Sequence, residues 1–92
     1  MEFKREDCTF TVPDRPTVRE QLAYYSAAAG SNTLLRYWIG AQALIGSWKS
    51  TILPDYKADV NTLSDPSQTT LIIWAGLEVM KFMNALDDIP KN

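Results

Sequence analysis

Histidine is absent from this 92-residue chain. It is the commonest general base at neutral pH, the usual activator of a catalytic serine or cysteine, and the commonest zinc ligand. The four glycines are scattered, so the chain also lacks a glycine-rich loop that would cradle a phosphate. We therefore expect a protein that is not an enzyme and has no catalytic residues, cofactor or metal.

Cysteine occurs only once, as Cys8. A single cysteine excludes an internal disulfide and a cysteine-based metal cluster. This usage is typical of the reducing cytosol, so a cytoplasmic location is expected. Cys8 itself is expected to be a small buried apolar residue.

Long apolar runs and an excess of basic residues are also missing. The longest apolar run, Leu71–Met80, is interrupted by Glu78, whereas a membrane-spanning helix needs about 20 apolar residues. The segment Met1–Asp7 is too charged for a signal peptide. Nine Lys and Arg residues stand against eleven Asp and Glu, a net charge of −2. Neither a membrane nor a nucleic acid is therefore expected as a partner.

The composition and patterns present predict a single domain over residues 1–92. Hydrophobic residues make up 46% and charged residues 22%, both ordinary for a globular protein. Residues 8–12, CTFTV, alternate apolar and polar side chains with the period of a half-buried strand. Phe3 begins a partner strand, with residues 5–7 as the turn. The expected fold is mainly α, with three helices and a short N-terminal β-strand or hairpin within residues 1–12.

The first helix is predicted over residues 17–30. Thr17 and Glu20 have the spacing of a capping box, and Gly30 is a natural C-terminal stop. Tyr24 lies off the main apolar face. That face, the predicted core face, contains Val18, Leu22, Tyr25 and Ala29.

The second helix is predicted over residues 32–53, capped by Ser31 and Asn32 and ended by Pro54. It is apolar on most sides, which is typical of a helix in the middle of a bundle. Gly40 and Gly46 each cost a helix about 1 kcal/mol relative to alanine. We therefore expect another backbone to approach them closely. The main stripe contains Leu34, Trp38, Ala41, Ile45, Trp48 and Ile52.

The third helix is predicted over residues 65–87, with Asp65 as N-cap and Pro66 in the first position. Residues 55–64 before it are expected to form a short helical turn or an ordered loop. Its predicted core stripe consists of Leu71, Ile72, Ala75, Val79, Phe82, Met83 and Leu86. A second apolar stripe on roughly the opposite side contains Ile73, Leu77 and Met80, with Trp74 beside them.

The second stripe has two interpretations. It is either buried under the N-terminal hairpin or residues 55–64, or exposed as a patch for a partner helix or a second copy of the chain. Trp and Met are enriched in interface cores, and large exposed apolar patches usually mark interaction sites. We take Ile73, Trp74, Leu77 and Met80 as the candidate protein-binding site.

Three segments give the chain an organisation that resembles the small tail assembly chaperones of long-tailed bacteriophages. After a short N-terminal strand come VPDRPTVREQLAYY (Val12–Tyr25) and YWIGAQALIGSWKSTILPD (Tyr37–Asp55). The last is IIWAGLEVMKFMNALDDIPKN (Ile72–Asn92), an aromatic-rich helix with a short Pro-Lys-Asn tail. The resemblance implies a non-catalytic protein that shields apolar helical segments of the tape measure protein in the host cell cytoplasm. It also implies a homo-oligomer.

Two other functions fit the same size and charge. One is a small phage-encoded inhibitor of a host or defence protein, which would act as a monomer or fixed dimer on one target. The other is a structural tail or connector subunit, which would be found in purified particles, whereas a chaperone would not.

Replacing Leu77 with Asp tests the candidate site. We expect loss of partner binding or self-association with retained helicity, because a charge on an apolar interface is costly to desolvate. Circular dichroism and a binding assay measure the two effects. Loss of the fold itself would show that the second stripe belongs to the core.

Overall fold

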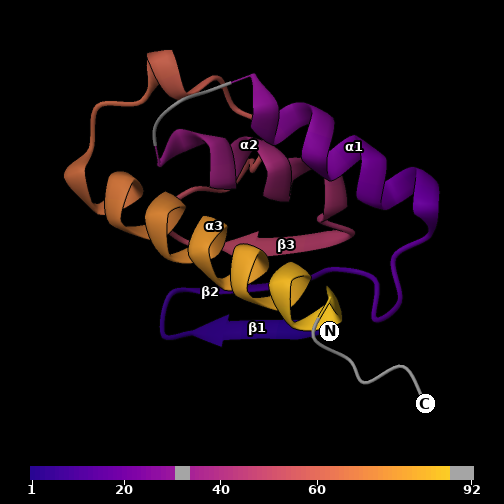
Figure 1. The fold of residues 1–92 in the computed structure, drawn as a ribbon. Helices are drawn as coiled ribbons and strands as arrows, with labels where there is room; N and C mark the ends of the chain where they lie inside the picture. The colour runs from indigo at the N-terminus through magenta and orange to yellow at the C-terminus, as the bar shows by residue number, and fades with distance from the viewer. Residues whose placement is uncertain (31–33, 88–92) are drawn as a thin grey trace.

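The computed structural model describes residues 1–30 and 34–87. The predicted cap at Ser31 and Asn32 lies outside the described residues, as does segment 88–92. The elements follow in the order β1 (Glu2–Arg5), β2 (Cys8–Thr11), α1 (Val18–Ala29), α2 (Leu35–Leu44), β3 (Ser47–Ser50), the 3-10 turn η1 (Val60–Thr62) and α3 (Pro66–Asp87). Figure 1 shows α2 between α1 and α3, with the sheet forming a second layer beneath the helices.

The three strands form an antiparallel sheet in the order β1-β2-β3. Its register places Phe3 opposite Phe10 and Phe10 opposite Trp48, so three aromatic side chains make a row on one face. Their ring centroids are 4.9 Å and 5.4 Å apart. The predicted hairpin and the alternation of residues 8–12 are confirmed, since the apolar members are buried and the threonines half-buried.

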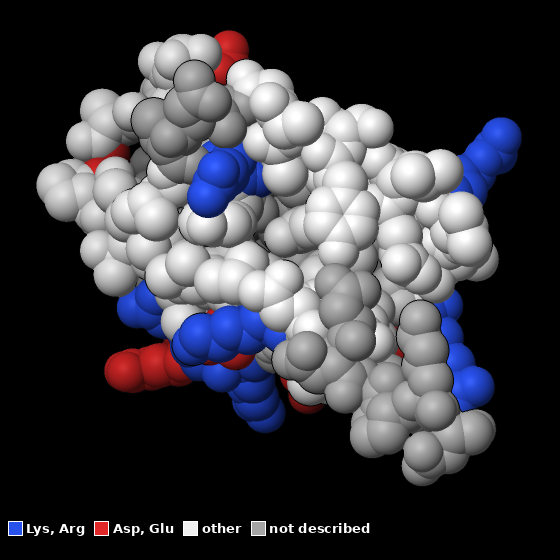
Figure 2. Space-filling model, viewed as in Figure 1, with Lys and Arg blue, Asp and Glu red and all other residues white. Residues whose placement is uncertain are grey.

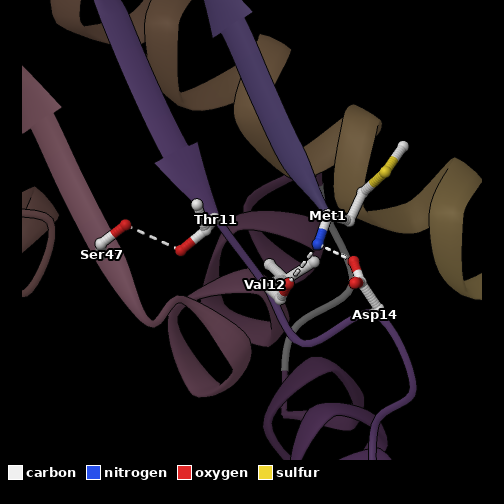
Figure 3. Close-up of polar contacts among 5 residues, drawn as sticks. All are labelled: Met1, Thr11, Val12, Asp14 and Ser47. Atoms are coloured by element: carbon white, nitrogen blue, oxygen red, sulfur yellow. Dashed lines mark hydrogen bonds and ion pairs between the residues drawn. The ribbon is translucent and has the colours of Figure 1, made fainter.

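Polar contacts tie the end of this sheet together (Figure 3). The Thr11 and Ser47 hydroxyl oxygens lie 2.7 Å apart between β2 and β3. The amino group of Met1 donates to the Val12 carbonyl at 2.8 Å and pairs with the Asp14 carboxylate. The hydrogen bond and charge of that ammonium group lower the pKa of Asp14. The chain is therefore held on both sides of β2 where it turns toward α1.

The prediction that the second helix continues to residue 53 is wrong beyond Leu44. Ile45 is extended (φ −61°, ψ 123°), and the amide of Gly46 donates to the Thr11 carbonyl at 2.9 Å. Residues 47–50 then pair with β2, which gives their backbone groups partners that a helix would otherwise supply. The Thr11 backbone therefore approaches Gly46, but an added Cβ would lie 3.6 Å from the Thr11 hydroxyl oxygen, an ordinary contact, so lack of space does not require a glycine at this position.

Packing of the half-buried Trp48 explains why the strand replaces the helix. Its ring lies 5.5 Å from that of Trp38, centroid to centroid, and its indole N–H donates to the Leu53 carbonyl at 2.6 Å. A helical period within a segment that contains Gly46 is a weak local preference, and sheet pairing overrides it. Three helices are present as predicted, although the second is shorter, and the third strand makes the fold a mixed α/β domain rather than a helical domain with a hairpin.

The predicted starts of α1 and α3 are confirmed. Thr17 Oγ1 accepts the amide of Glu20 at 3.1 Å, and the Glu20 carboxylate accepts the amide of Thr17 at 2.9 Å. The Asp65 carboxylate accepts the amide of Ser67 at 3.0 Å, which lowers the pKa of Asp65. Residues 55–64 were predicted to form either a short helical turn or an ordered loop. The structure shows the helical turn, as η1.

The core lies where α3 crosses α2 and the sheet. The α3 residues facing it recur every fourth position: Leu71, Ala75, Val79 and Met83 are all fully or almost fully buried. Phe82 meets the sheet through Phe3, with ring centroids 6.2 Å apart. At Gly76 an added Cβ would lie 2.8 Å from the Trp38 amide nitrogen and 3.0 Å from the Tyr37 carbonyl carbon. The two helix backbones therefore touch at this glycine.

Gly76→Ala is expected to destabilise the protein. The new methyl group would meet backbone atoms of α2, and overpacking of this kind costs about 1–3 kcal/mol, against a gain of about 1 kcal/mol in helix propensity. We expect a net loss of up to about 2 kcal/mol in the free energy of unfolding, measured by urea denaturation. Gly30→Ala is the control, because among residues 1–30 and 34–87 its Cβ would meet only the Ala27 carbonyl oxygen, at 3.6 Å. Equal stability of the two variants would contradict the backbone contact.

Candidate interaction surface

Large exposed apolar side chains form a stripe along α1. Val18 is 71% exposed, Leu22 61% and Tyr25 44%. Ala29 continues the same line one turn further and is also exposed. We call these four residues the α1 stripe. A contiguous exposed apolar surface of this kind is typical of an interaction site.

The stripe was predicted to face the core, and this prediction is wrong. The helix instead packs on α2 through its opposite side, where Tyr24 is only 4% exposed and Ala27 and Ala28 are half-buried. A Cβ on Gly40 would lie 2.9 Å from the Tyr24 ring and 3.3 Å from the Tyr24 carbonyl oxygen, so the close approach expected at Gly40 is confirmed. Burial raises the pKa of Tyr24. The fit of one tyrosine onto one glycine thus turns the apolar stripe outward.

Few charges lie on this side of the molecule. Figure 2, seen from the same direction as Figure 1, shows a mostly uncharged surface over α1, with basic residues at its far edge and a second basic group left of centre. Acidic and basic side chains gather instead near the hairpin of β1 and β2. The α1 stripe therefore lies in a surface with few charges, and Arg19 and Arg36 are among those near it.

A hollow of about 350 Å³ adjoins the stripe, between the C-terminal half of α1, the start of α2 and α3. Tyr25 belongs to both the stripe and the hollow, which makes them one continuous surface. Inside, the Arg36 guanidinium donates to the Tyr37 hydroxyl at 2.9 Å and lies 4.9 Å from the Tyr37 ring centroid. We call this the tyrosine hollow. It offers a docked side chain aromatic walls and the polar groups of Arg36 and Asn84.

The candidate residues on α3 are all half-buried and fall in different places. Met80 lines the tyrosine hollow. Ile73 lines a second, apolar hollow of about 380 Å³ with Leu34. Trp74 lies on the sheet side, where its ring centroid is 5.7 Å from that of Phe10. Leu77 is half-buried between them along the helix.

The structure thus brings Met80 close to the α1 stripe and Trp74 against the sheet. The α1 stripe was missed as a binding surface because helical periodicity identifies an apolar face without saying whether that face is buried. The opposite face of α1 did contain a sign that it is the packed face. Ala27 and Ala28 on that face are small, and small residues allow a helix to approach a neighbour such as Gly40 closely.

The part of the chain that the structure describes contains no group of three or more Asp, Glu or Cys side chains arranged to hold a metal ion. No helix in residues 1–30 or 34–87 has the length and hydropathy to cross a membrane. Comparison with models of protein families, with curated proteins and with solved structures finds no match to the chain.

Cys8 has none of the features of a reactive thiol. The side chain is 3% exposed on the inner face of β2. Burial, and then the charge of Asp7, raise the pKa of the thiol from 9.0 to about 11. Because the thiolate is the nucleophile, this thiol is almost wholly in its unreactive form at neutral pH.

We expect Cys8 in the folded protein to react with a thiol reagent at pH 8 about 100-fold more slowly than in urea, because its thiolate fraction falls by that factor. The raised pKa of Cys8 also makes the free energy of unfolding depend on pH, because the folded protein holds the thiol proton more tightly than the unfolded chain does. The contribution of Cys8 to the free energy of unfolding is complete below pH 9 and is lost as the pH rises toward about 11. Equal labelling rates in folded and unfolded protein would contradict this account of the site.

Proposed function

We propose that the protein is a non-catalytic binding protein that covers an apolar helical segment of another protein. The observation that carries this proposal is the α1 stripe, which leaves three large apolar side chains on successive turns in water. Burying each of them against a partner would yield about 1.5–3 kcal/mol. The resemblance to tail assembly chaperones suggests the tape measure protein as the client.

A helix is the client shape that this surface favours. Side chains at positions 18, 22 and 25 form a ridge along α1, and such a ridge packs into the groove between side chains of a second helix. The tyrosine hollow lies beside the ridge and would receive one side chain of the client. Met80 at its wall would then contribute to binding, as the sequence predicted for that residue.

Such binding would be modest in strength. Association itself costs an estimated 4–15 kcal/mol, which offsets most of the burial of three side chains. A weak complex suits a chaperone, because its client must be released when assembly begins. The stripe itself contains no charged residue, so different apolar segments of one long helical client would be accepted.

Leu22→Asp is expected to abolish protection of the client. The residue is 61% exposed, so the fold should change in stability by no more than about 0.5 kcal/mol. The measurement is light scattering of an apolar segment of a tape measure protein diluted from denaturant, with and without the protein.

Ala23→Asp provides the matched control. It adds the same charge to the same exposed helix but lies away from the α1 stripe. Wild type and Ala23→Asp should keep the client in solution, whereas Leu22→Asp should not. Equal protection by both variants would rule out the stripe as the client site.

A further inference from the structure

Among the residues that line the tyrosine hollow, Arg36 is the one that carries a charge. Its guanidinium donates to the Tyr37 hydroxyl and lies over the Tyr37 ring. A cation that is stacked on a ring and hydrogen-bonded to its hydroxyl has fewer positions to adopt than a free side chain. Arg36 is therefore partly held in place before a ligand binds.

No carboxylate in the described part of the chain pairs with Arg36. On α1, the Glu20 carboxylate accepts the Thr17 amide. On α3, the Glu78 carboxylate lies 3.8 Å from the Lys81 ammonium group. The helix α2 contains no acidic residue. The contact with the Tyr37 hydroxyl uses only one of the guanidinium N–H donors, so the others can donate to an acceptor from another molecule.

The walls of the hollow suit an aliphatic stem that ends in such an acceptor. Tyr24, Tyr25 and Met80 present rings and a thioether, and Ala28 and Ala29 leave space beside them. Apolar groups that close over an ion pair exclude water and strengthen the attraction between the two charges. A glutamate side chain has both parts, because its methylene groups are apolar and its carboxylate can accept two parallel N–H groups from an arginine.

The hollow lies at one end of the α1 stripe, because Tyr25 and Ala29 belong to both. A client helix that covers the stripe would therefore meet the hollow near one of its own ends. The side chain that enters the hollow comes from about one turn beyond the apolar residues that contact the stripe.

We propose that the tyrosine hollow binds a glutamate side chain of the client, and that Arg36 makes the protein prefer clients with an acidic residue at this point. The inference rests on the proposed function, because the carboxylate arrives on the helix that covers the stripe. It adds a rule of recognition: the position of one negative charge ranks apolar segments that would otherwise bind alike.

Three synthetic helical peptides test this preference with the wild-type protein. Each has leucines at the spacing of Val18, Leu22 and Tyr25, and they differ only in the residue one turn beyond the last leucine, which is Glu, Gln or Lys. Fluorescence anisotropy of the labelled peptides measures the Kd. We expect the Glu peptide to bind about 5-fold more tightly than the Gln peptide, the factor of a partly screened ion pair, and the Lys peptide to bind most weakly. High salt should reduce the preference.

Variants of Arg36 assign the preference to the hollow. Arg36→Gln should bind the Glu and Gln peptides equally, and Arg36→Glu should prefer the Lys peptide. Arg19→Gln is the matched control, because it removes the same charge from an exposed arginine at the other end of the stripe, and it should keep the preference for Glu. Circular dichroism checks that each variant keeps its helices.

The outcomes separate this inference from the proposed function. Equal affinity of wild type for the Glu and Gln peptides would overturn the inference and leave the proposed function, as would a preference for Glu that Arg36→Gln retains. Failure of all three peptides to bind wild type would overturn the proposed function, and the inference with it.

Discussion

The two close helix contacts on α2 are the constraint on which the rest of the structure depends. On one side the Tyr24 ring of α1 lies against Gly40, and on the other the backbone of α3 at Gly76 touches the backbone at Tyr37 and Trp38. A side chain at either glycine would collide with its neighbour. These contacts set how α1 and α3 are rotated about their own axes, and so which side chains each one turns toward solvent.

The sheet contributes through the aromatic row that it turns toward the helices. Phe10 in the central strand is fully buried and contacts Phe3, Trp48 and Trp74. Trp48 in turn contacts Trp38 of α2. One connected group of rings therefore joins all three strands to α2 and α3. The helix α1 is outside this group and is attached through Tyr24 and small residues, which leaves its apolar stripe available for binding.

Local interactions explain what the sequence alone determined. The start of α1 at Thr17 and Glu20, the start of α3 at Asp65, and the alternation along β2 all depend on residues within a few positions of one another. The core stripe of α3 likewise follows from a four-residue repeat. Such features are readable because the groups that interact are close in the chain.

The tertiary structure decided the third strand and the orientation of α1. Residues 47–50 leave a helical pattern because the edge of β2, far away in the sequence, offers them backbone partners and a place to pack Trp48. The face of α1 with the larger apolar side chains is exposed because Tyr24 fits Gly40 better than the stripe would. Both outcomes depend on contacts between segments that are far apart in the sequence. A local sequence pattern does not describe such contacts.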